Sequence, residues 1–159
     1  MIILGVDPGS HATGYGVIST EPVVRMLAGG VIRTSAKAPL SERLLTIYTE
    51  LSDVIAAHNP MQMAVEDLFN AKNPRSALIL GHARGVILLA GATAGLTPAE
   101  YAPRAVKQAL TGRGSATKEQ VRFMVMRLLA LKEEPPLDMS DALAVALAHN
   151  GRSRFAGLG

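Results

Sequence analysis

Four acidic residues lie where patterned segments of the chain end or begin. Asp7 closes the apolar run MIILGV, and Glu66 closes the run MQMAV. Asp138 and Asp141 stand three residues apart at the start of the last helical segment, and this spacing puts both on one helix face. If these segments pack side by side, the four carboxylates converge at one place.

Such a cluster of carboxylates calls for bound cations. Like charges within about 4 to 6 Å raise each other's pKa and disfavour ionisation. Carboxylate oxygens are hard ligands that select Mg²⁺ or Mn²⁺. We therefore expect these four acids to bind magnesium, for which manganese could substitute.

Each acid also has an ordinary structural explanation. Asp7 begins the sequence DPG, which is common turn chemistry, and a strand-end residue such as Glu66 is commonly solvated. Asp138 or Asp141 could simply stabilise a helix N-terminus. Taken singly, each explanation is simpler than catalysis. Together they require four independent accidents, so the joint pattern favours a metal site.

The elements that must position these acids alternate between strands and helices. Apolar β-rich runs predict strands, and apolar residues at helical spacing predict helices. The expected strands cover 1–6, 14–19, 26–34, 61–66 and 100–102. The expected helices cover 41–58, 75–94, 103–110, a segment capped by Thr117 and Gln120, and a last segment that begins near Asp138. This order predicts an α/β fold in which a mixed sheet carries helices on its faces.

A single domain accounts for the chain of 159 residues, of which 48% are hydrophobic and 18% charged. Residues from about 151 to 159 are expected to form a frayed tail. The absence of cysteine excludes disulfides and thiolate chemistry and fits a reducing cytosol. The longest charge-free apolar stretch, 85–96, is too short to span a bilayer, and the N-terminus lacks the charged region of a signal peptide. We expect a soluble cytoplasmic protein with no membrane contact.

Basic residues are concentrated in the middle of the chain. Between residues 68 and 130 there are nine Lys or Arg against two acids, Glu100 and Glu119. A solvated basic surface is the simpler interpretation. A phosphate-binding face beside an acidic pocket is the more specific one.

The segment 75–94 is unusually apolar for one helix. The run ALILGHARGVILLAGATAG, which makes up most of it, has only His82 and Arg84 as ionisable interruptions. The pattern predicts a helix that is buried on more than one side, in the core or in a subunit interface.

Four long segments together resemble the RuvC family of Holliday-junction resolvases. They are GVDPGSHATGYGVI, AVEDLFNAKNPRSALILGHARG, VKQALTGRGSATKEQV and DMSDALAVALAH, and they occur in the family's order through nearly the whole chain. The resemblance implies a ribonuclease H-like fold, a mixed β-sheet with helices on both faces. It also implies that Asp7, Glu66, Asp138 and Asp141 are the catalytic metal ligands.

The implied activity is crossover junction endodeoxyribonuclease activity in recombination and repair. Two metal ions would hydrolyse a phosphodiester bond, with Asp7 bridging both, and leave 5′-phosphate and 3′-hydroxyl ends. By the same resemblance, Lys107 and Lys118 contact the DNA, and Phe69 stacks on an unpaired base of the junction. A hydrophobic plug under the loop is the alternative role for Phe69.

A four-way junction requires two symmetric cuts, so the resemblance also implies a homodimer, for which segment 75–94 is the candidate interface. A branch-migration motor complex is a further partner of similar proteins.

Two other interpretations of the sequence remain open. The segment GVDPGSHATGYGV also resembles the phosphate loop of actin-like ATPases and sugar kinases, and a non-catalytic DNA-structure binder would explain the basic stretch without the acids.

Overall fold

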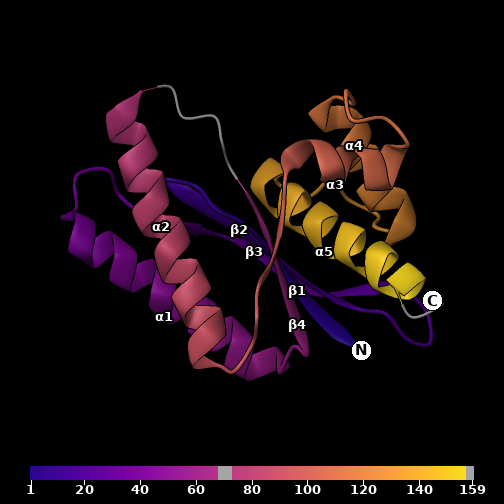
Figure 1. Ribbon diagram of the computed structural model, residues 1–159, viewed down its shortest axis with the longest axis horizontal. Coiled ribbons are helices and arrows are strands. Elements are labelled where there is room, and N and C mark those ends of the chain that lie inside the picture. Colours follow the sequence, from indigo (N-terminus) through magenta and orange to yellow (C-terminus); the bar gives the residue numbers. More distant parts are fainter. Residues whose placement is uncertain (68–72, 157–159) are drawn as a thin grey trace.

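A five-stranded mixed sheet forms the centre of the computed structural model, which describes residues 1–67 and 73–156 (Figure 1). The strands are β1 (Ile2–Asp7), β2 (Ala12–Ser19), β3 (Arg25–Arg33), β4 (Gln62–Glu66) and β5 (Ala99–Tyr101). Their order across the sheet is β3-β2-β1-β4-β5, in which β1, β2 and β3 pair antiparallel while β4 and β5 run parallel to β1. Strand β1 therefore lies in the middle and ends at Asp7.

Helices cover both faces of the sheet, as the sequence predicts. On one face lie α1 (Leu40–His58) and α2 (Pro74–Thr93). On the other lie α3 (Pro103–Thr111), α4 (Lys118–Leu128) and α5 (Leu137–Ala156). Figure 1 shows the two groups of helices on opposite sides of the strands. The α/β fold with a mixed sheet is confirmed.

Helix α5 packs directly on the backbone of the central strands because glycines leave room for it. A Cβ atom on Gly5 would collide with the carbonyl oxygen of Ala142, and one on Gly14 would collide with that of Asp138. Gly14 is the register partner of Asp7. The absence of a side chain at Gly14 therefore brings the first turn of α5 over the strand ends that carry the acid.

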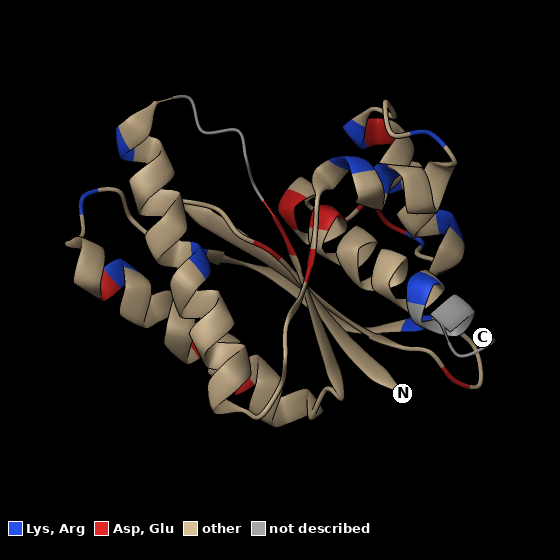
Figure 2. Cartoon of the chain, viewed as in Figure 1, with Lys and Arg blue, Asp and Glu red and all other residues tan. Residues whose placement is uncertain are grey.

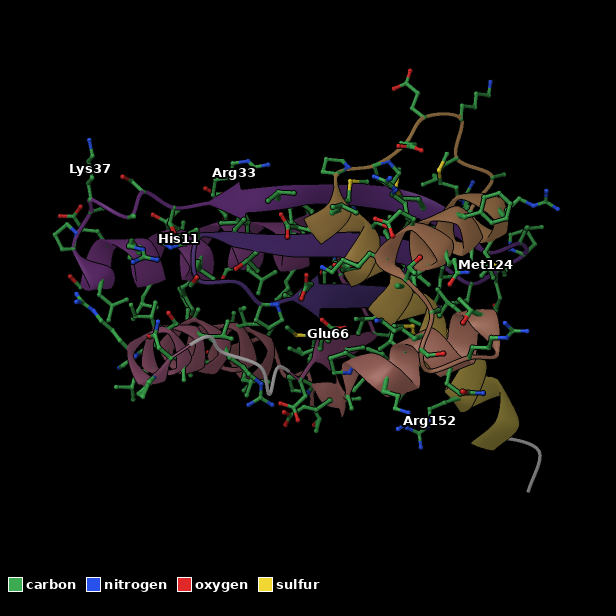
Figure 3. The ribbon with its side chains drawn as sticks, turned by 90° about the horizontal axis from the view of Figure 1, so that it is seen from above. His11, Arg33, Lys37, Glu66, Met124 and Arg152 are labelled. Carbon is green, nitrogen blue, oxygen red and sulfur yellow. The ribbon has the colours of Figure 1, made fainter. Side chains whose placement is uncertain are left out.

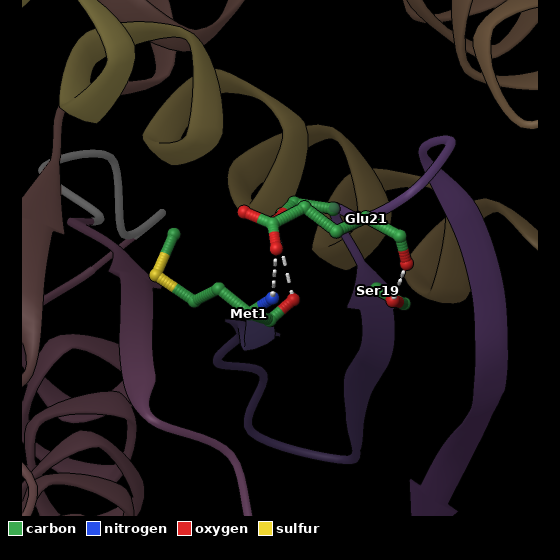
Figure 4. Close-up of polar contacts among 4 residues, drawn as sticks. Met1, Ser19 and Glu21 are labelled. Carbon is green, nitrogen blue, oxygen red and sulfur yellow. Dashed lines mark hydrogen bonds and ion pairs between the residues drawn. The ribbon is translucent and has the colours of Figure 1, made fainter.

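The beginning of β1 is tied to the end of β2. The amino group of Met1 lies 3.9 Å from Oε2 of Glu21, and the Ser19 hydroxyl donates a 2.9 Å hydrogen bond to the Glu21 carbonyl (Figure 4). Thr20 donates from its backbone nitrogen to the Met1 carbonyl at 2.9 Å. These contacts hold together the end of the β1–β2 pair that lies opposite the end with Asp7.

Two expectations from the sequence can be compared with these elements. Helix α5 continues through Ala156, past residue 151 where a frayed tail is expected. Within the single chain α2 is buried on one side only, along a stripe made of Ala83, Ile87, Ala90 and Gly91, so burial of a second side would need a subunit interface. Its other side is open, with Leu78 and Leu89 exposed by 66% and 56%.

Among the described residues, α2 is the one helix long and apolar enough to cross a membrane by length and composition. That match is weak evidence for a membrane span. The inner side of α2 packs on the sheet and along α1, so the helix belongs to the folded domain.

Candidate active site

Asp7 and Glu66 lie side by side at one end of the sheet. Strands β1 and β4 run parallel, with Val6 opposite Val65, so the next residues, Asp7 and Glu66, reach the same edge. Glu66 lies near the centre of the view in Figure 3. Only 8% of the surface of Asp7 is exposed, and its carboxyl shares a hydrogen bond with that of Glu66.

Burial and nearby negative charge raise the pKa of both carboxyls. Burial is the largest cause for Asp7, and the nearby charges of Glu66 and Asp141 add to it, so that its pKa rises to about 9. Burial is also the main cause of the raised pKa of Glu66. Without a cation, this pair holds a proton at neutral pH.

Asp138 and Asp141 lie in the first turns of α5, as predicted. The backbone of Asp138 passes over Gly14, the partner of Asp7 across the β1–β2 ladder. Asp141 is close enough to Asp7 and Glu66 to raise the pKa of each. The fold thus brings together Asp7, Glu66 and Asp141. The Asp138 side chain makes no hydrogen bond or ion pair with any described residue.

Lys118, at the start of α4, supplies a positive charge to this acidic group. Its Nζ lies 2.8 Å from Oδ2 of Asp141. This hydrogen bond is the first cause of the raised pKa of Lys118. The capping box of α4, in which Thr117 and Gln120 bond reciprocally, fixes the helix end that carries Lys118.

A pocket of about 450 Å³ opens beside the acids. Lys107 and Arg104 of α3 line it, together with Lys118, Glu66 and Asp141. In Figure 2 the blue segments of α3 and α4 face the red end of α5. Part of the basic stretch seen in the sequence therefore borders the acidic site, which is the arrangement that a phosphate-binding pocket requires.

The residues present fit a hard divalent cation. Their donors are carboxylate oxygens, the buried pair of Asp7 and Glu66 shares a proton for lack of positive charge, and Asp141 is paired with an ammonium group. Within the described ranges, no three His, Asp or Glu side chains already stand in the arrangement of a metal site.

An ion-pair group behind Glu66 was not predicted from the sequence. Arg84 of α2 pairs with Asp67 at 3.3 Å and with Glu100 of β5. The backbone nitrogen of Asp67 also donates a 2.8 Å hydrogen bond to the Tyr101 carbonyl. The signal for this group is present in the sequence, because Arg84 is the only Lys, Arg, Asp or Glu in the apolar run 77–95.

Of the three DNA-contacting residues expected from the resemblance, Lys107 and Lys118 lie at the pocket. Phe69 lies outside the described residues.

Comparison with known proteins shows which family the chain belongs to. The family model described as crossover junction endodeoxyribonuclease RuvC matches residues 3–149. The crossover junction endodeoxyribonuclease RuvC of Pseudomonas putida (strain W619) is 51% identical over 149 residues, which cover 93% of this chain and 85% of the relative. That of Desulforamulus reducens is 51% identical over 151 residues, covering 94% and 93%.

Solved structures give the same result. Thermus thermophilus RuvC has a TM-score of 0.91 at 38% identity, covering 98% of this chain and 97% of that one. The same protein in complex with a Holliday junction substrate has a TM-score of 0.93, with 98% and 96% covered. With a matching family model over most of its length, close relatives and a ribonuclease H-like fold, the chain belongs to the RuvC family of crossover junction endodeoxyribonucleases.

Proposed function

We propose that this protein resolves Holliday junctions by nicking two opposed strands through metal-dependent hydrolysis of a phosphodiester bond. The observation that carries the proposal is the buried pair of Asp7 and Glu66, with Asp141 beside it and a basic pocket next to it. Buried carboxylates bordered by cationic side chains suit a phosphodiester and its metal ions. A protein that only bound DNA would have no use for the acids.

The proposed ligands of the metal ions are Asp7, Glu66, Asp138 and Asp141, of which Asp7 is the most enclosed. Two bound Mg²⁺ ions would activate the attacking water and stabilise the leaving 3′ oxygen. The chain itself would hold the phosphate between the carboxylates and the cations of α3 and α4. The products would carry 5′-phosphate and 3′-hydroxyl ends.

Lys107 and Lys118 are the proposed contacts to the DNA backbone at the pocket, and Phe69 is the proposed stacking partner of an unpaired base. Lys118 would also release the Asp141 carboxylate when a metal ion binds that carboxylate in its place. Its present bond to Asp141 supports this dual role.

A homodimer is the proposed assembly, with the outer side of α2 as its interface. A hollow of about 520 Å³ lies on that side, lined by Leu78, Gly81, Gly85 and Leu89 among others. A Cβ atom on Gly81 or Gly85 would meet nothing within 4 Å, so a second helix has room to approach closely. A two-fold pair of chains would offer matching sites to the two equivalent strands of a junction. We also propose a branch-migration motor complex as a further partner. The proposed location of the protein is the cytoplasm.

The decisive experiment compares cleavage of a synthetic four-way junction with cleavage of a linear duplex, with and without Mg²⁺. We expect metal-dependent nicks at symmetric positions of the junction alone. Asp7→Asn should bind the junction and leave it uncut, while Asp53→Asn on the exposed side of α1 serves as the matched control. Binding without any cleavage by the wild-type protein would favour the non-catalytic binder, and ATP turnover would favour the ATPase interpretation.

A further inference from the structure

We propose that the corner of the sheet around Arg33 is a second phosphate-binding surface, which holds the junction strand on the side of the acids away from Lys107 and Lys118. The inference rests on the proposed nuclease function and adds to it a contact that neither the motifs nor the basic stretch of the sequence indicated.

The register of the sheet places Arg33 on the same face as Asp7. Asp7 pairs with Gly14, and Gly14 pairs with Val31, so these three share one rung. Directly paired strand residues point to the same face, and so do residues two apart along a strand. The side chain of Arg33 is two residues beyond Val31. It therefore lies on the face that carries Asp7 and α5.

The separation suits a strand that passes over both residues. Arg33 is two strands across the sheet from Asp7 and two residues further along, which puts their Cα atoms roughly 12 Å apart for ordinary strand spacings. A DNA strand carries one phosphate at every nucleotide, so Arg33 would meet a phosphate a few nucleotides from the one at the acids.

Arg33 is exposed, and its guanidinium has no ion pair or hydrogen bond with any residue that the structure describes. Two further basic groups, His11 and Lys37, are exposed nearby. The backbone of His11 is held at this corner, because its carbonyl accepts a 2.9 Å hydrogen bond from the nitrogen of Thr34. Figure 3 shows His11, Arg33 and Lys37 toward one end of the sheet, with Glu66 between them and the α4 residue Met124.

Arg43 of α1 also holds the backbone of this corner in place. Arg43 of α1, only 7% exposed, donates to the Ser10 carbonyl and, through Nε, to the Thr34 hydroxyl at 3.4 Å. Its Nη2 lies 3.4 Å from Nδ1 of His11. A surface held in place in this way loses little conformational entropy when a ligand binds. These contacts therefore make the corner a prepared surface for the backbone of DNA.

A cation on an edge strand has another common use, because it discourages pairing with the edge of a second sheet. Arg25 separates the two roles. It is the other end residue of β3, is exposed like Arg33, and lies at the far end of the sheet from Asp7. Both residues would protect the edge, but only Arg33 lies on the proposed path of the DNA.

The test compares Arg33→Gln with Arg25→Gln in junction binding, measured in EDTA at several salt concentrations. Each phosphate contact contributes about 0.9 to the slope of log K against log salt. We expect Arg33→Gln to reduce that slope by about one and Arg25→Gln to leave it unchanged. In Mg²⁺, Arg33→Gln should raise KM and keep kcat, because the contact is remote from the reacting atoms. Equal melting temperatures exclude a folding defect.

Equal salt slopes for the two variants, or a wild-type protein that does not bind the junction, would overturn the inference. A reduced slope for Arg33→Gln in a wild-type protein that binds but never cuts would support the surface and refute the nuclease. The binding arm and the cleavage arm therefore distinguish the two proposals.

Discussion

The ammonium group of Lys118 lies 2.8 Å from Oδ2 of Asp141, at the edge of a group of buried carboxyls that lacks positive charge. The two residues come from different helices, α4 and α5, and are 23 positions apart in the sequence. In this position the lysine bonds to one carboxylate oxygen that a metal ion would use. Lys118 and the metal ion therefore compete for the carboxylate of Asp141.

Replacing Lys118 with methionine should therefore strengthen Mg²⁺ binding. The side chain is 60% exposed, so the ion pair has the modest strength of a solvated one, and we expect the Mg²⁺ dissociation constant to fall about two- to fivefold. Isothermal titration calorimetry without DNA measures this directly. Lys107→Met is the control, because Lys107 lines the same pocket without bonding to an acid among the described residues. Weaker Mg²⁺ binding by Lys118→Met would show that the lysine supports the metal site.

How far the sequence predicts this site depends on which contact is considered. Asp7 and Glu66 could be predicted to be neighbours, because each ends an apolar run that reads as a buried strand. The pairing of Lys118 with Asp141 could not, because it depends on how α4 packs against α5. The close packing of α5 on Gly14 could not be predicted either, because it depends on the absence of a side chain at that position.

The ends of helices show the same limit. The sequence predicts a frayed tail from about residue 151 onward. In the structure α5 continues through Gly151 to Ala156. Helix α2 was expected to be enclosed because its composition is apolar all round. Composition alone does not distinguish burial within one chain from burial between two.

The raised pKa of Asp7 predicts how metal-free protein responds to pH. An unfolded aspartate ionises near 3.8, whereas folded Asp7 holds its proton up to about 9. Between these values only the unfolded state loses the proton, so the free energy of unfolding should fall as pH rises from about 4 toward 9. Asp7→Asn removes this loss. In EDTA its melting temperature should exceed that of the wild type, by a margin that grows with pH.

Each kcal/mol of this gain should raise the melting temperature by about 2 to 4 °C for a chain of this size. Thermal denaturation at pH 5, 7 and 8.5 measures the margin, and Asp53→Asn on an exposed part of α1 should show none. Added Mg²⁺ should stabilise the wild type and have a much smaller effect on Asp7→Asn. A margin that shrinks with rising pH would contradict the assignment of a proton to Asp7.

Gly14→Ala should disturb the site from behind. The added methyl group would collide with the carbonyl of Asp138, so the first turn of α5 must shift away from the strand ends. Forcing a methyl group into such a contact costs about 1 to 3 kcal/mol. We expect that loss in urea denaturation, together with weaker Mg²⁺ binding by the folded fraction.

Gly151→Ala is the matched control for this substitution. Gly151 lies in the same helix, and a methyl group there meets nothing within 4 Å. Because alanine favours the helix over glycine by up to about 1 kcal/mol, this variant should be as stable as the wild type or more so. Unchanged stability and Mg²⁺ affinity in Gly14→Ala would mean that α5 is not held by this contact.

Leu89→Glu should separate the proposed dimer. Leu89 is 56% exposed on the open side of α2, and a buried interface would leave a glutamate there without a partner. Sedimentation velocity at micromolar concentration should give a dimer for the wild type and a monomer for Leu89→Glu. The control is Val23→Glu, which adds the same charge at a site that is 70% exposed and not on α2.

Cleavage of a supercoiled plasmid with an extruded cruciform gives a second readout of the dimer. The monomer should produce nicked circles, because its cuts are unpaired, whereas the dimer should produce linear DNA. A Leu89→Glu protein that sediments as a dimer would move the interface away from α2.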